Sequence, residues 1–131
     1  MATTKSDMAL RCVLMTLCRG SFESSSGLTP EFKVFWSQFG RAFRTYLKTE
    51  LGATEVYLRR GHFEISGHFR TKPGWYYFNT GDVRYRLQGP RLLVRTAEHA
   101  ADYHGGPNMY IPIDNVDSFK TQMKTLTTKE N

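Results

Sequence analysis

The spacing of hydrophobic residues changes near residue 54 from a helical to an alternating pattern. Before that point, apolar residues recur every three or four positions along one helix face: Phe32, Phe35, Trp36, Phe39, Phe43, Tyr46 and Leu47. Thr29 offers a capping hydroxyl, Pro30 suits the first helical position, and Gly52 suits the helix end. The sequence therefore predicts a long amphipathic helix that begins at Pro30.

From Thr54 onward the polar and apolar residues alternate, which is typical of half-buried strands. This alternation predicts strands over about 54–59, 62–70, 75–80, 83–87 and 91–96, with a further short strand open at Met109 to Ile111. Glycine or proline punctuates each interval between them, and such short connections favour antiparallel neighbours. We expect a meander of about five strands.

The two ends of the chain carry weaker helical patterns. Leu10, Leu14 and Leu17 fit an N-terminal helix, but the alternation of Leu10, Cys12 and Leu14 also fits a strand, and both alternatives stay open. A C-terminal helix is expected from Asp114, with these residues on its buried stripe: Val116, Phe119, Met123 and Leu126.

Together these elements predict a single α+β domain over 1–131, in which the antiparallel meander packs against the long helix and the C-terminal helix. Residues 21–28, with three consecutive serines, are expected to form a linker. Residues 1–6 and 127–131 are expected to be flexible ends.

The composition indicates a folded, basic protein without a disulfide framework. The chain is 40% hydrophobic and 14% aromatic, which is enough apolar material to form a core. Its net charge of +6 favours polyanionic partners, such as nucleic acid. Cys12 and Cys18 are too few for a disulfide framework and form no CxxC pair, so we expect a cytoplasmic protein. The sequence suggests no cofactor, and no stretch reaches the roughly 18 apolar residues of a membrane helix.

Basic residues on the long helix form the first candidate site. With Ser37 between the first two, the basic residues Lys33, Arg41, Arg44 and Lys48 fall in a row at intervals of three and four, opposite the aromatic face, and could follow a phosphate backbone. Arg59 and Arg60 add cations beside the predicted sheet. The alternative is that these residues form the ordinary solvated face of an amphipathic helix.

Aromatic residues of the sheet form the second candidate. Trp75 or Tyr76 could stack on unpaired bases next to arginines. Alternation places about half of the sheet's aromatic rings in the core, so core packing is the competing explanation.

Histidines form the third candidate. His62, Glu64 and His68 are expected on one strand face, and a long polar loop carries His99 and His104. If that loop folded over the strand, a metal or acid–base site could assemble from His62, His68, His99 and His104. The alternative is a set of exposed polar residues, since no metal-binding motif such as HExxH occurs.

The segments from Arg95 to His99 and from Asp102 to Asn108, after hairpins carrying Gly61-His62-Phe63 and Ile65-Ser66-Gly67, resemble small phage and conjugative-element accessory proteins. The resemblance implies a role such as inhibition of a host defence nuclease, as anti-CRISPR proteins perform. It transfers no functional residues.

The first functional hypothesis is therefore a non-enzymatic module that binds nucleic acid or a nucleoprotein complex. The alternative is a mobile-element inhibitor that binds a nucleic-acid-binding host protein through exposed aromatics and arginines. A small metal-dependent hydrolase is the third. No membrane partner is expected, and exposed edge strands leave a homodimer open.

Overall fold

The computed structural model describes residues 4–19, 30–61, 64–83, 90–102 and 105–128. Its helices are α1 (Lys5–Arg19), α2 (Pro30–Glu50) and α3 (Val116–Thr128). Its strands are β1 (Glu55–Arg60), β2 (Ile65–Arg70), β3 (Trp75–Asn79), β4 (Arg91–Ala97) and β5 (Met109–Pro112). Among these described helices, none combines the length and apolar character needed to cross a membrane.

The strands form one antiparallel sheet in the order β1-β2-β3-β4-β5, so each strand pairs with the next one along the chain. This order confirms the predicted meander and the α+β class. The register places Val56 opposite Phe69 and Phe69 opposite Tyr76, which brings large apolar side chains together on one side of the sheet.

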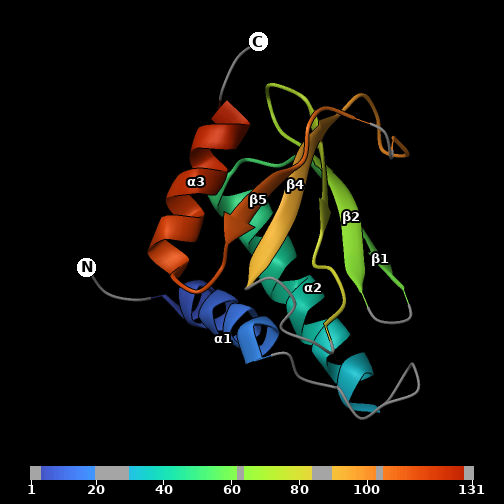
Figure 1. Ribbon diagram of the computed structural model, residues 1–131. Coiled ribbons are helices and arrows are strands. Elements are labelled where there is room, and N and C mark those ends of the chain that lie inside the picture. The colour runs from blue at the N-terminus through green and yellow to red at the C-terminus, as the bar shows by residue number, and fades with distance from the viewer. Residues whose placement is uncertain (1–3, 20–29, 62–63, 84–89, 103–104, 129–131) are drawn as a thin grey trace.

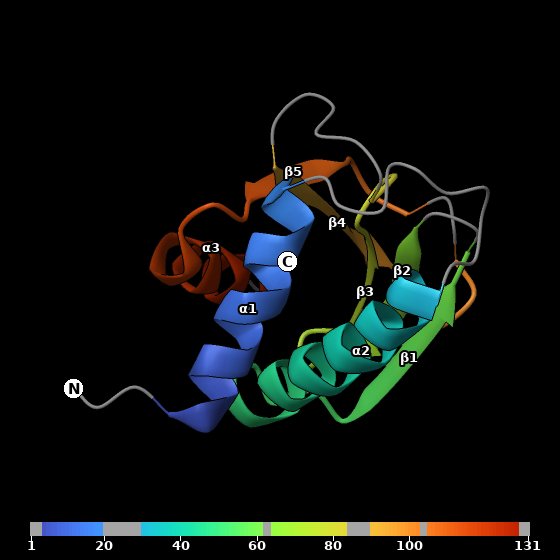
Figure 2. The same ribbon diagram turned by 90° about the horizontal axis from the view of Figure 1, so that it is seen from below.

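All three helices lie on that same side of the sheet (Figures 1 and 2). Helix α2 supplies more of the buried core than any other described element, because its aromatic stripe faces the strands, as the helical spacing predicts. Phe43 makes an edge contact with Phe78 of β3 at a ring-centroid distance of 4.9 Å. Tyr46 reaches Phe119 of α3 at 5.8 Å. Burial of each such aromatic ring contributes about 1.5–3 kcal/mol.

Gly67 allows β1 and β3 to approach β2 closely. A Cβ atom at this position would lie 2.1 Å from the carbonyl oxygen of Tyr57 and 2.9 Å from Cε1 of Phe78. Both separations are shorter than van der Waals contact, so glycine is required here.

The N-terminal segment, for which a helix and a strand stayed open, is a helix, and the C-terminal helix begins two residues later than expected. The first helix begins at Lys5, and its cap is Thr4, whose Oγ1 accepts a hydrogen bond from the Asp7 amide at 3.0 Å. The C-terminal helix begins at Val116 with Asn115 as its cap, because the Asn115 side chain accepts from the Ser118 amide at 3.0 Å. The expected flexible ends overlap these helices at 5–6 and 127–128, and Thr127 is buried.

Strand boundaries differ by one residue at β1, β3 and β4, and two further strands also differ. The strand expected over 62–70 begins at Ile65, and the short strand at the end of the long loop extends to Pro112. The linker expected at 21–28 lies wholly outside the described residues, and of the strand expected at 83–87 only Val83 is described. In the described sheet, β3 pairs directly with β4.

Candidate functional site

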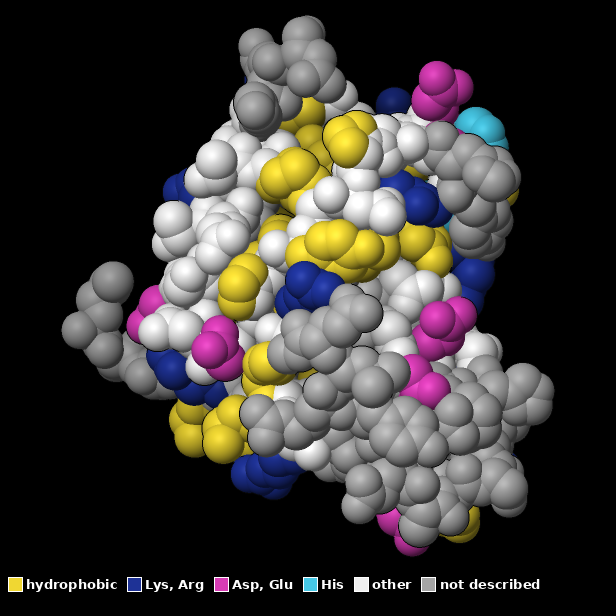
Figure 3. All heavy atoms as spheres, viewed as in Figure 1, with side chains coloured by type: hydrophobic (Ala, Val, Ile, Leu, Met, Phe, Trp, Pro, Cys, Tyr) yellow, Lys and Arg dark blue, Asp and Glu magenta, His cyan; other side chains and the backbone are white. Residues whose placement is uncertain are grey.

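The sheet face opposite the helices, called here the open face, is rich in arginine and aromatic side chains. Figure 3 looks onto it and shows hydrophobic and basic side chains next to one another over the strands. By register, the face carries Glu55, Tyr57 and Arg59 of β1, Ser66, His68 and Arg70 of β2, Trp75, Tyr77 and Asn79 of β3, Arg91, Leu93 and Arg95 of β4, and Tyr110 of β5.

Trp75, which is half-buried, is the centre of an aromatic group near one end of this face. Its ring stacks with that of Tyr57 at a centroid distance of 6.0 Å and an interplanar angle of 20°. The Arg70 guanidinium lies 5.9 Å from the Trp75 ring centroid. Tyr57 is 45% exposed, and its hydroxyl donates to Glu55 at 3.0 Å, which is the main reason that its pKa is raised. The group presents an open aromatic surface beside a positive charge.

A second ring and guanidinium pair lies on the last two strands. The Arg91 guanidinium is 4.4 Å from the ring centroid of Tyr110, which is 48% exposed. Between the two exposed groups, Arg95 covers Tyr77 at 4.5 Å. Arginines over aromatic faces make cation–π contacts, each worth about 0.5–1 kcal/mol at exposed sites.

His68 lies at the middle of the open face and is completely buried. Its Nδ1 atom is 2.8 Å from Nη1 of Arg59, and its Nε2 atom is 2.8 Å from the carbonyl oxygen of Asp102. Because a guanidinium can only donate and a carbonyl can only accept, the ring carries its proton on Nε2 and is neutral. Burial lowers the pKa of His68, the Asp102 hydrogen bond opposes this change, and the charge of Arg59 adds to the lowering.

The loop after β4 folds over His68. Arg59 also donates through Nη2 to the carbonyl oxygen of Ala100 at 2.7 Å. Within the loop, the Asp102 carboxylate accepts from the Glu98 amide at 2.9 Å. Further along, a Cβ atom at Gly105 would lie 1.8 Å from the Thr96 carbonyl oxygen, so the chain can return against β4 only with glycine there. Ala100 and Asp102 of this loop thus lie against Arg59 and His68 on the open face.

The loop approaches His68 as the histidine hypothesis requires, but the described residues around it form no metal site. Both ring nitrogens of His68 are already occupied by protein partners. His99 is exposed, and its Nδ1 atom accepts from the Ala101 amide at 3.1 Å. Within the part of the chain that the structure describes, no group of three or more His, Cys, Asp or Glu residues is placed to hold a metal ion. His62 and His104 lie outside the described residues.

The structure divides the predicted basic site between two sides of the molecule. The four basic residues of α2 are all exposed, on the helical side of the sheet: Lys33, Arg41, Arg44 and Lys48. Arg44 reaches the edge of the sheet and donates to the carbonyl oxygen of Val56 at 3.4 Å. Arg59 and Trp75, in contrast, lie on the open face, and Arg60 is exposed at the end of β1. These residues therefore do not form one continuous site.

Tyr76 must be removed from the candidate site. It points into the core, is 3% exposed, and stacks on Phe69 at 5.3 Å. Its hydroxyl donates to the carbonyl oxygen of Leu126 at 3.4 Å, so the ring is unavailable to a ligand. Sequence reasoning did not select Tyr57 and Tyr110 for the site, although both are exposed beside arginines or stacked rings. The strand register places Tyr57 and Tyr110 on the same face as Trp75, and this register could not be predicted from the sequence.

In comparisons with known proteins, no family model, no curated protein and no solved structure matches this chain.

Proposed function

We propose that the open face of the sheet binds single-stranded nucleic acid, and that the protein is a non-catalytic binding module. The observation that carries this proposal is the pairing of exposed aromatic rings with guanidinium groups on a face that no described helix covers. Bases stack on such rings, and arginines bind the phosphates that join them.

Trp75 and Tyr57 form the main stacking position in this proposal. Each base stacked on an aromatic side chain contributes about 1–3 kcal/mol. Arg70 lies beside this position, and its ion pair with Glu55 has a separation of 3.4 Å between exposed groups, so a phosphate can compete for the guanidinium. Arg91 of β4 and Tyr110 of β5 form another pair of a guanidinium and an aromatic ring. In this proposal they provide a second contact for the bound nucleic-acid strand.

Single strands fit this face better than a duplex. The rings can stack only on bases that are free of their neighbours, which a duplex does not offer. The net charge of +6 adds long-range attraction for any polyanion, so affinity is expected to fall as salt rises.

The experiment uses the two tryptophans of the chain, Trp36 and Trp75. A Trp36→Phe protein leaves Trp75 as the single reporter, and its fluorescence is titrated with a 12-nucleotide oligothymidine and with a duplex at 50 and 200 mM salt. We expect the single strand to quench Trp75 and to bind more tightly than the duplex.

Paired variants then locate the surface. Arg70→Ala with Arg91→Ala removes two cations from the open face and is expected to weaken binding at least about tenfold and to lower the salt slope by about 1–2. Lys33→Ala with Lys48→Ala removes the same charge from α2 and is expected to change affinity by less than about threefold. Equal losses in the two variants, or no single-strand binding at low salt, would refute the proposal.

A further inference from the structure

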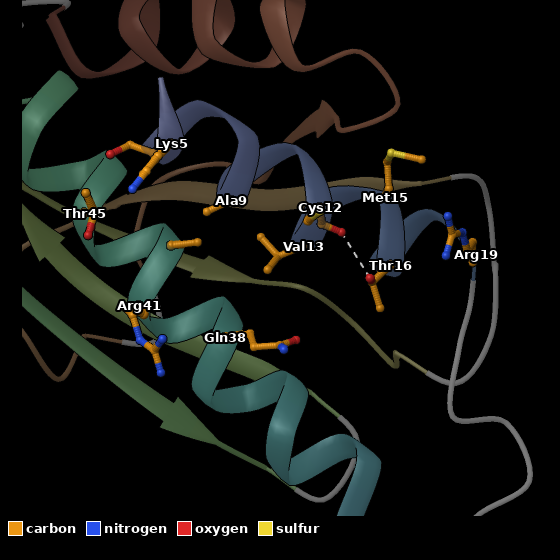
Figure 4. A pocket seen from close by; sticks show the side chains of 12 residues that line it. Lys5, Ala9, Cys12, Val13, Met15, Thr16, Arg19, Gln38, Arg41 and Thr45 are labelled. Carbon is orange, nitrogen blue, oxygen red and sulfur yellow. Dashed lines mark hydrogen bonds between the residues drawn. The ribbon is translucent and has the colours of Figure 1, made fainter. Parts of the chain in front are cut away.

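A groove separates α1 from α2 on the helical side of the molecule, away from the open face (Figure 4). It encloses about 670 Å³, within the range of ligand-binding clefts. Its apolar lining includes Ala9 and Val13 of α1 and Ala42 of α2. On the neighbouring surface of α1, Met8 and Met15 are 58% and 54% exposed. Exposed methionines beside an apolar groove are typical of surfaces that receive an apolar helix face.

The charges around the groove have one sign. Lys5 and Arg19 stand at the two ends of α1, and Arg41 borders the groove from α2 (Figure 4). Among the described residues that line the groove, none is an aspartate or a glutamate. Among the ion pairs recorded for the described residues, none involves these three cations, whereas Arg11, on the same helix, pairs with Asp117 at 3.4 Å. The groove therefore combines an apolar floor with an uncompensated positive rim.

We infer that this groove is a docking site for an acidic amphipathic helix of a partner protein. The helix would place its apolar face along exposed Ala9, over the nearly buried Val13 and Ala42, and its carboxylates beside the three cations Lys5, Arg19 and Arg41. This interaction is distinct from the proposed nucleic-acid binding and uses the opposite side of the molecule.

The length of the groove favours a helix over a small molecule. Lys5 and Arg19 are both lining residues and are 14 positions apart in α1, which corresponds to about 21 Å at 1.5 Å per residue. A helix of about four turns spans this distance.

Charge argues against a second copy of this chain as the occupant, and the lining argues against nucleic acid. A second copy of this chain would bring its own net charge of +6 to a basic rim, and repulsion would oppose that contact. Nucleic acid could contact the cations, but no lining residue that the structure describes has an aromatic ring on which a base could stack.

The test uses a fluorescein-labelled 16-residue peptide with leucines at helical spacing on one face and glutamates on the other positions. A scrambled peptide of the same composition keeps the charge but has no apolar face. We expect micromolar binding of the amphipathic peptide by fluorescence anisotropy, and binding of the scrambled peptide at least about tenfold weaker. Equal affinity for the two peptides, or no binding of either, would overturn the inference.

Variants with equal charge change locate the contact. Arg19→Glu with Arg41→Glu is expected to weaken peptide binding at least about tenfold, and Lys72→Glu with Lys124→Glu, exposed cations outside the groove, by less than about threefold. Circular dichroism of each variant checks that it is folded. Equal loss in the two double variants would overturn the inference because it would reduce the interaction to net charge.

Cys12 provides an independent probe, because it is exposed and lines the groove. A bulky maleimide on Cys12 should block peptide binding, and a Cys12→Ser protein treated with the same reagent should still bind. Binding to phosphatidylglycerol vesicles, or dimerisation, that depends on Arg19 and Arg41 while the peptide fails to bind would identify a different occupant and overturn the inference.

Discussion

Arg59 and His68 lie on neighbouring strands and are joined by a hydrogen bond of 2.8 Å from the guanidinium to Nδ1 of the ring. Each side chain uses a second nitrogen to bind the carbonyl oxygen of a loop residue, Ala100 for Arg59 and Asp102 for His68. Two adjacent side chains of the open face thus fasten the loop that follows β4.

Replacement of Arg59 should therefore destabilise the protein. Arg59→Ala removes the hydrogen bonds to His68 and Ala100, and we expect a loss of about 2 kcal/mol, the scale for hydrogen bonds to charged groups. Arg60→Ala removes the same side chain from the next, exposed position and should change the free energy of unfolding by less than about 0.5 kcal/mol. Urea unfolding of both variants measures these differences, and similar losses would contradict the proposed fastening role.

Mild acid should weaken the fold through His68. Its pKa in the folded protein is below the ordinary 6.5, so the unfolded chain binds a proton that the folded chain does not. The His68 contribution is constant well above pH 6.5 and is lost as the pH falls from there through the lowered pKa. The slope cannot exceed about 1.4 kcal/mol per pH unit, the value for one proton.

Urea unfolding at pH 7.5, 6.5 and 5.5 measures this effect. His68→Gln should flatten the decline in stability with falling pH because glutamine does not titrate. His99→Gln changes an exposed histidine and should keep the decline. If the His68 variant lost stability with pH as steeply as the original protein, another group would be responsible.

The elements that depend on local periodicity could be predicted from the sequence. The helical spacing of Phe32 to Leu47 and the turns between the strands were sufficient for α2 and for the meander. Trp75 and Tyr76 show where this reasoning ends. Alternation requires that adjacent residues face opposite sides, but it does not say which of the two faces the core. The structure resolves the choice because Tyr76 stacks on Phe69 beneath the helices.

The surroundings of His68 depend on long-range contacts. Its partner Asp102 is 34 residues away in the sequence, and no local pattern indicates this pairing. For the same reason the groove between α1 and α2 could not be predicted, because the packing of the two helices creates it. Arg41 was selected from the sequence as a phosphate ligand, but its position at the groove depends on that packing.

Gly67 should be intolerant of substitution. Gly67→Ala places a Cβ atom 2.1 Å from a backbone oxygen that can move only if β1 shifts, so we expect a loss of more than about 3 kcal/mol or failure to fold. Gly40→Ala is the matched change in α2, where a Cβ atom would meet Leu58 at 3.4 Å. That variant should be neutral or more stable by up to about 1 kcal/mol because alanine favours a helix. Thermal unfolding of both variants tests the contrast, and a stable Gly67→Ala protein would contradict it.

Removal of the Tyr46 hydroxyl should stabilise the protein. This buried oxygen has no hydrogen-bond partner among the described residues, and burial raises the pKa of Tyr46. Tyr46→Phe removes an unsatisfied polar group, and we expect a gain of about 1 kcal/mol. Tyr76→Phe instead removes the hydroxyl that donates to Leu126 and should cost about 0.5–1 kcal/mol. Opposite shifts of the urea midpoint confirm the assignment, whereas a loss in both variants would indicate a partner for Tyr46.

The sheet order has a consequence for folding kinetics. Because every strand pairs with the next one along the chain, each pairing closes a short loop and loses little chain entropy. Contacts between α1 and α3 close the longest loop, since Lys120 pairs with Asp7 across 113 residues. During synthesis, the strands can therefore pair in order as they leave the ribosome. The N-terminal helix must wait for the last helix before its docking is complete.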